Sequence, residues 1–174
     1  MKIILWIVIT PFIVLGLFIV ARLLLCNPNR EVIKVASPIA KIIADDIVKN
    51  GIPKSLKDIE GLSYELEGCE RSEVYKKGSP NRIEVKTKDK ADYIVITETC
   101  YFEKNNLLYS VELWAIENFY KNSWSNGNFY VYNLKNHTGI KYLIKQKQNT
   151  NKWYIEEFYL FDNKTSGICT TFKQ

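Results

Sequence analysis

The chain has 174 residues and a formal net charge of +5, and 47% of its residues are hydrophobic and 13% aromatic. This much apolar surface can form one hydrophobic core, so the composition excludes an intrinsically disordered chain. The 24 basic residues are nearly balanced by 19 acidic ones, and the two signs alternate between Arg82 and Lys90, which argues against a nucleic-acid partner.

The chain begins with a long apolar segment. Residues 3–20 contain no charged side chain, and Arg22 is the only charge from there to Cys26. A helix over this stretch would be roughly 27 to 36 Å long at about 1.5 Å per residue, close to the thickness of bilayer hydrocarbon. We therefore expect residues 1–26 to form a transmembrane anchor, with the lipid bilayer as a partner.

Two alternatives start from the same segment. A cleaved secretory leader has an apolar region of about 7 to 15 residues, which is shorter than this one. A lipidated Cys26 would need a small residue before it, where the chain has Leu25. We expect the uncleaved, single-pass form.

Two signals bear on the orientation of the domain that follows, and they oppose each other. More basic residues closely follow the apolar segment than precede it, which by the positive-inside rule would leave the domain in the cytoplasm. Long domains cross membranes largely regardless of charge, however, and several cysteines suit an oxidising exterior. We predict a signal-anchor protein of the inner (cytoplasmic) membrane of a bacterium, with its domain on the extracytoplasmic, periplasmic side.

The segment after the anchor changes character twice. Residues 27–36 are predicted to be a juxtamembrane linker, because Pro28 cannot continue a regular helix. An amphipathic helix should then begin with Ser37 as its N-cap and Pro38 at its first position. Apolar residues recur at one-face spacing until Asn50-Gly51, which should end the helix.

From Leu62 onward, apolar and polar residues alternate, which is the period of a β-strand. The strands expected from this pattern are residues 83–85, 93–100, 107–116, 129–134, 140–145 and 153–161, separated by polar turns. We predict an α+β fold: a transmembrane helix, an amphipathic helix, and then an antiparallel meander of five to seven strands. The extracytoplasmic domain would comprise residues 37–174.

No group of residues fits a catalytic site. The one histidine, His137, lies in a predicted turn. Asp45 and Asp46 would point about 100° apart on a helix. Glu156 and Glu157 would point to opposite faces of a strand, so neither pair can share a proton. We expect a protein that is not an enzyme and that has no cofactor and no metal.

Three cysteines follow the predicted anchor. Cys69, Cys100 and Cys169 are widely spaced, without a neighbouring histidine, which fits a structural disulfide better than zinc or thioredoxin-like chemistry. Of the three pairings we favour Cys69 with Cys100. The alternative, that all are reduced core thiols, stays open.

Aromatic residues are frequent in the second half of the chain. Strand alternation should place about half of them on the outer face of the sheet, where aromatic side chains contribute strongly to binding. We predict an interaction surface that includes Trp124, Tyr130, Tyr132 and Trp153. Core packing and cross-strand pairing are the alternative explanation.

The order of elements resembles a known family. A membrane helix, an amphipathic helix and the sequence Gly51-Ile52-Pro53-Lys54-Ser55-Leu56-Lys57-Asp58-Ile59 before a meander resemble the type IV pilins and pseudopilins, over roughly residues 1–66. The chain departs from that family because it lacks a short leader ending in glycine and a glutamate within the apolar run. Trp153-Tyr154-Ile155 also resembles the closing strand of NTF2-like domains.

These observations predict a single-pass, membrane-anchored protein with a non-catalytic domain for interaction or assembly, which is what the pilin resemblance implies. Its partner would be another envelope protein or further copies of the chain. The alternative is a tethered ligand-binding module, NTF2-like or otherwise, with a pocket between the helix and the sheet.

Overall fold

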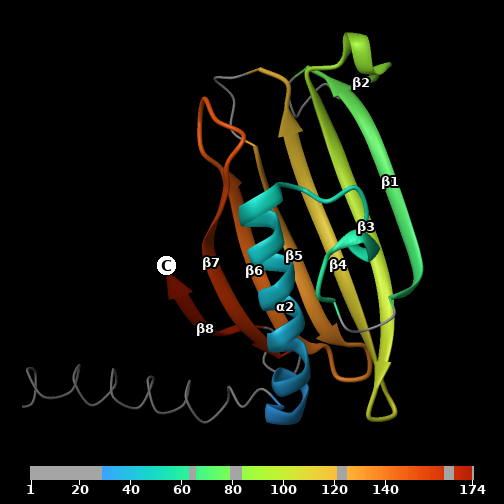
Figure 1. Ribbon diagram of the computed structural model, residues 1–174, viewed down its shortest axis with the longest axis vertical. Helices are drawn as coiled ribbons and strands as arrows, with labels where there is room; N and C mark the ends of the chain where they lie inside the picture. Colours follow the sequence, from blue (N-terminus) through green and yellow to red (C-terminus); the bar gives the residue numbers. More distant parts are fainter. Residues whose placement is uncertain (1–28, 63–65, 79–83, 121–124, 163–166, 174) are drawn as a thin grey trace, which may run out of the picture.

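The computed structural model describes residues 29–62, 66–78, 84–120, 125–162 and 167–173, in which one α-helix lies across one face of an eight-stranded antiparallel sheet (Figure 1). The elements are α2 (Arg30–Asn50), the 3₁₀ turn η1 (Leu56–Asp58), β1 (Glu67–Lys77), β2 (Glu84–Val85), the 3₁₀ turn η2 (Lys88–Lys90), β3 (Tyr93–Lys104), β4 (Leu107–Asn118), β5 (Asn126–Asn133), β6 (Thr138–Gln146), β7 (Trp153–Asp162) and β8 (Gly167–Lys173). The strand order is β2-β1-β3-β4-β5-β6-β7-β8, so from β3 onward each strand pairs with the next one in the chain.

The helix α2 begins earlier than the sequence pattern predicts. Asn29 is its N-cap, and Pro38 lies inside the helix rather than at its first position. The buried stripe already starts at Val32, and burying this additional apolar turn offsets the cost of about 3 kcal/mol for a proline in a helix interior. The predicted start at Ser37 is therefore wrong, and residues 30–36 of the predicted linker are helical.

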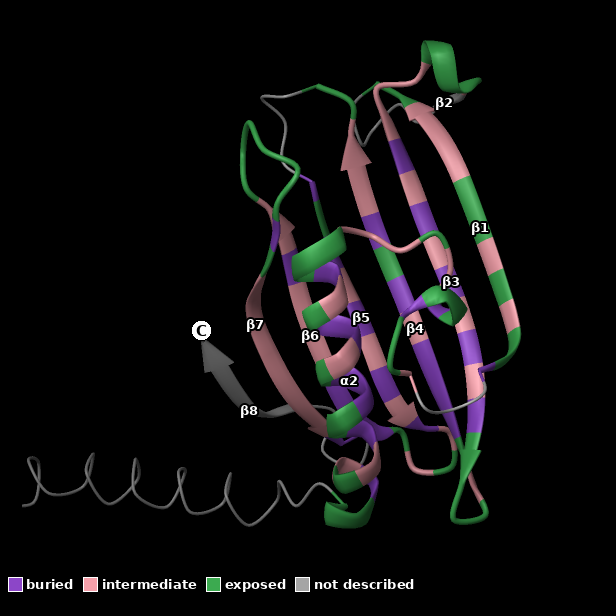
Figure 2. Cartoon of the chain, viewed as in Figure 1, coloured by how far each residue is buried: buried purple, intermediate pink, exposed green. Residues whose placement is uncertain are grey.

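The core lies on the face of the sheet that carries α2 and the η1 segment, and the buried stretches in Figure 2 lie on α2 and along β3 to β6. The helix contributes its buried stripe and packs against β5, β6 and β7. The largest fully buried side chains on the sheet side include Tyr109, Leu113, Phe129 and Ile144. This cluster fills the space between α2 and the sheet, where the ligand-module alternative would place a pocket.

The sheet has eight strands where five to seven were predicted. The strands β2 to β7 overlap the predicted strand segments, and β1 and β8 are additional. The sequence of β1 is mostly charged and polar and lacks a clean alternation, because β1 lies near one edge of the sheet with many exposed side chains. Its position is set by its pairing with β3.

The membrane prediction requires a correction. None of the helices in the described part of the chain combines the length and the apolar character needed to span a bilayer. This finding contradicts the predicted transmembrane fold class, the single-pass signal-anchor assignment and the inner-membrane localisation. Residues 1–26, on which the predicted anchor falls, lie outside the described residues.

Candidate functional site

We call the face of the sheet that points away from α2 the outer face. Along β3 to β7 its residues alternate with those of the core. Its aromatic and aliphatic members include Tyr101, Trp114, Ile116, Tyr130, Tyr132, Leu143, Tyr159 and Phe161, and its polar members include Ser110, Glu112 and Lys141. Most of these side chains are half-buried, and Trp114 is 36% exposed.

Aromatic rings meet near the middle of the outer face. Tyr130 and Phe161 contact edge to face, with ring centroids 6.0 Å apart. The ring of Tyr132 lies 6.1 Å from that of Phe161 and stacks at 5.8 Å on His137, in the turn between β5 and β6. Such contacts hold large rings in place, so their exposed edges form a preformed contact surface.

A tyrosine and a carboxylate are hydrogen-bonded within this surface. The hydroxyl of Tyr132 donates to Oε1 of Glu112 at 2.5 Å, and Ser110 Oγ donates to the same oxygen at 3.4 Å. Burial, followed by the bond to Glu112, raises the pKa of Tyr132 to about 12. The tyrosine therefore remains a protonated donor at neutral pH.

Three outer-face residues form a row across neighbouring strands. Glu112 on β4 pairs in register with Tyr130 on β5, which pairs with Lys141 on β6. Lys141 Nζ lies 4.9 Å from the centroid of the Tyr130 ring, a distance at which the ammonium group and the ring attract each other. The row thus has an anionic end, an aromatic centre and a cationic end.

The four aromatic residues predicted as one interaction surface do not form one. Tyr130 and Tyr132 lie on the outer face. Trp153 is 3% exposed, on the core side of β7 and close to Gly51, so its role is packing. Trp124 lies outside the described residues. The outer face also contains residues that the sequence pattern did not predict, namely Trp114, Phe161, Glu112 and Lys141. They become recognisable only when the register places them beside Tyr130 and Tyr132.

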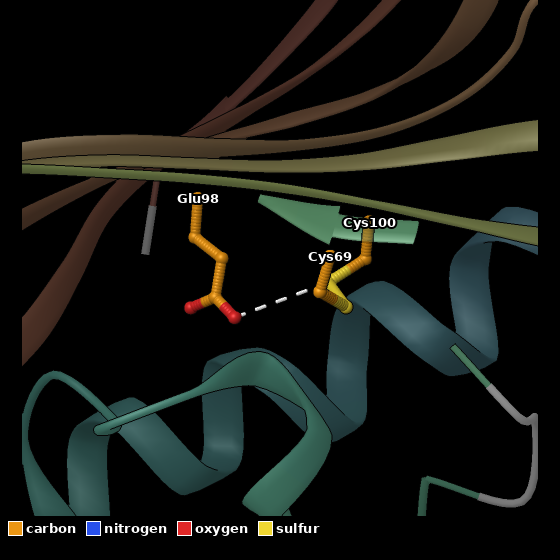
Figure 3. A group of neighbouring side chains, drawn as sticks. All are labelled: Cys69, Glu98 and Cys100. Carbon is orange, nitrogen blue, oxygen red and sulfur yellow. Dashed lines mark hydrogen bonds between the residues drawn. A yellow bond between two sulfur atoms is a disulfide. The ribbon is translucent and has the colours of Figure 1, made fainter. Parts of the chain in front are cut away.

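A second cluster joins β1, β3 and the segment after α2 (Figure 3). Cys69 and Cys100 form a disulfide, which is the pairing favoured from the sequence. Glu98 lies beside it and is 2% exposed. Its carboxylate accepts hydrogen bonds from Ser55 Oγ at 2.7 Å and from the backbone N–H of Leu56 at 3.1 Å.

This cluster is a structural link. Arg71 Nη1 donates to Glu98 Oε2 at 3.0 Å, so both carboxylate oxygens accept from protein donors. The sulfur atoms of Cys69 and Cys100 are bonded to each other, and Cys100 Sγ lies 3.9 Å from Glu98 Oε1 (Figure 3). Because a disulfide sulfur carries no proton and both sulfurs are oxidised, this arrangement offers neither a thiolate ligand nor a nucleophile.

Two adjoining clefts lie at the end of the sheet near the carboxyl end of α2. The larger has a volume of about 350 Å³ and is lined by Asn50, Gly51, Ile52, Glu117, Asn118, Phe119, Gln146, Asn151 and Trp153. Burial raises the pKa of Glu117, and the ring of Phe119 is 44% exposed. Five of these nine lining residues have amide or carboxylate side chains, whereas small-molecule pockets are mostly apolar, so the outer face is the stronger candidate.

Comparison of the chain with protein-family models, with curated proteins and with solved structures gives no match. The chemistry of the outer face is therefore the basis for a function.

Proposed function

We propose that this chain is a non-catalytic interaction domain that binds a protein partner through the outer face of its sheet. One observation carries the proposal. An antiparallel sheet covered on one side normally presents polar residues on the other, yet here the outer positions of β4, β5 and β7 hold Trp114, Tyr130, Tyr132 and Phe161.

The chemistry of the outer face matches a protein surface better than a small molecule. Tyrosine and tryptophan dominate the binding energy of protein interfaces, because they combine a large apolar area with a polar atom. The rings of Tyr130 and Tyr132 are each held by a neighbouring ring, so docking would cost little side-chain entropy. Glu112 and Lys141 provide polar contacts that fix the orientation of a partner.

The size of the outer face is also appropriate. Five strands at about 4.8 Å spacing, each about ten residues long at about 3.4 Å per residue, present roughly 800 Å². A standard protein interface buries about 800 Å² on each partner. The pilin-like and NTF2-like resemblances stay predictions.

The test is site-specific photo-crosslinking of the full chain in the cells that produce it. A photoreactive phenylalanine analogue replaces Trp114 on the outer face, and in the control it replaces Val48, which is 46% exposed on α2. We expect an adduct from position 114 and none from position 48, with the crosslinked protein identified by mass spectrometry. Binding of that protein, once purified, should weaken about tenfold or more with Tyr130→Ala.

Two results would overturn the proposal. One is that position 114 gives no adduct, or only those that position 48 also gives. The other is that Tyr130→Ala leaves the affinity for the identified protein unchanged while the variant unfolds at the same denaturant concentration as the original chain.

A further inference from the structure

We infer that the partner of the outer face is a second copy of this chain, packed face to face about a two-fold axis that runs along β5 at Tyr130. The inference rests on the proposed function and adds the identity and orientation of the partner. It follows from three neighbouring rows of side chains on the outer face. Each row matches the same row of a second copy in charge, size or polarity.

The central row is complementary in charge. Glu112 and Lys141 are the register neighbours of Tyr130 on its two sides. A two-fold rotation about an axis along β5 exchanges the two sides of the row and turns the face over. It therefore places Glu112 of each copy opposite Lys141 of the other, and the two Tyr130 rings opposite each other.

The flanking rows are complementary in size and polarity. On one side Trp114, Asn128 and Leu143 are register neighbours, so the same rotation sets the aromatic Trp114 against the aliphatic Leu143 of the other copy. On the other side Ser110, Tyr132 and Gly139 are neighbours. The rotation then sets Ser110 of each copy against Gly139 of the other, on either side of the two Tyr132 rings.

Other orientations of two copies lose this match. A two-fold axis that runs across the strands keeps the order of each row, which would set Glu112 against Glu112 and Lys141 against Lys141. Like charges facing each other in an interface are strongly unfavourable. Aligned packing of two sheets, about 10 Å apart and twisted by about 30°, keeps residues one strand away from the axis in contact.

The test compares the self-association of charge variants of the purified full chain by sedimentation velocity over a range of concentrations. Glu112→Lys and Lys141→Glu should each weaken the dimer about tenfold or more, because each sets like charges against each other twice. An equal mixture of the two variants should associate as tightly as the original chain, since its mixed dimer has opposite charges at both contacts. Lys41→Glu, at an exposed position of α2, is the control and should not change the dimer.

Foldedness is controlled by comparing the unfolding transition of every variant with that of the original chain. Lys141→Glu leaves the Glu112–Tyr132 hydrogen bond intact, so it tests the inference even if Glu112→Lys fails to fold. Because all variants share residues 1–28, an effect that depends on positions 112 and 141 comes from the outer face.

The failures of the two proposals are distinguishable. A chain that sediments as a monomer throughout, while position 114 crosslinks to a different protein, overturns this inference and leaves the proposed function in place. Weakened single variants without recovery in the mixture overturn the two-fold arrangement. The absence of any specific adduct from position 114 overturns both.

Discussion

Arg71 Nη1 lies 3.0 Å from Oε2 of Glu98, and this ion pair connects β1 to β3 where the disulfide also joins them. Arg71 also donates to the carbonyl oxygen of Pro53 at 3.2 Å, and Glu98 accepts from the backbone N–H of Leu56. One pair of side chains therefore fixes the segment that leaves α2 onto the sheet.

Replacing Glu98 should be costly for stability. Glu98→Ala leaves the donors at Ser55 and Leu56 without their acceptor and removes a buried partner from Arg71. Arg71 is partly exposed and keeps Glu73 as a partner, so we expect a loss of about 3 kcal/mol in the free energy of unfolding, the low end for broken buried pairs. Chemical denaturation measures it.

The matched control is Glu103→Ala, an exposed glutamate on the same strand. It should change the free energy of unfolding by no more than about 0.5 kcal/mol. If Glu98→Ala behaves like the control, the carboxylate does not anchor the segment after α2.

Reduction of the disulfide should also destabilise the fold. Cys69 and Cys100 are separated by 31 positions, and closing a loop of that length lowers the entropy of the unfolded chain enough to stabilise by roughly 3 to 4 kcal/mol. A dithiol reductant should therefore lower the denaturation midpoint of the original chain. The midpoint of Cys69→Ser should not respond to the reductant, and equal responses of the two proteins would contradict this role.

The hydroxyl of Tyr132 should make stability depend on alkaline pH. The folded chain holds this proton up to about pH 12, whereas an unfolded tyrosine loses it near pH 10. The contribution to stability is therefore complete below about pH 10 and is lost as the pH rises towards 12. Denaturation midpoints of the original chain and of Tyr132→Phe, measured across this range, should converge as pH rises, and parallel profiles would refute the assignment.

The variant Glu112→Gln separates the two causes of the raised Tyr132 pKa, which are burial and the carboxylate of Glu112. Burial is the larger cause and remains in this variant, while the negative charge of Glu112 is removed. We expect the pKa of Tyr132 to fall part of the way towards 10, as seen in an ultraviolet difference titration against the same variant carrying Tyr132→Phe. A complete return to 10 would mean that burial is not the main cause.

A methyl group at Gly139 should disrupt the outer face. A Cβ atom there would lie 2.3 Å from the carbonyl oxygen of Val131 and 2.4 Å from Cβ of Tyr132, so Gly139→Ala must displace backbone. Overpacking of this kind costs about 1 to 3 kcal/mol. The control is Ser72→Ala, at an exposed position on β1. The measurement is the midpoint of thermal unfolding. Equal midpoints for the two variants would show that the sheet accommodates the methyl group at position 139 without a cost in stability.

The sequence predicted the local elements well where one physical signal dominated. The strands β3 to β7 and the turn before Leu107 could be predicted from the sequence pattern. In that turn Asn105 and Asn106 adopt the left-handed conformation that asparagine tolerates in tight hairpins. The predicted helix start was wrong because Pro38 lies inside the helix and the buried stripe already begins at Val32. Tertiary burial outweighed a local signal there.

The candidate site was only half predictable. Alternation indicates that Tyr130 and Tyr132 share a face, but it cannot tell which face α2 will cover. Trp153 was therefore placed on the wrong face, although its own strand was correctly delimited. Glu112 and Lys141 lie far apart in sequence, and only the register of β4, β5 and β6 makes them neighbours of one tyrosine.

The helix α2 precedes all the described strands in the chain, yet its cover consists of β5, β6 and β7, the first of which begins only at Asn126. During synthesis, the apolar stripe of the helix leaves the ribosome well before the residues that will bury it. Strands from β3 onward pair with their neighbours in sequence, so hairpins can close as they emerge. In the nascent chain, β3 and β4 can therefore pair while the apolar stripe of α2 is not yet covered by β5, β6 and β7. A chaperone would find its binding site in that interval.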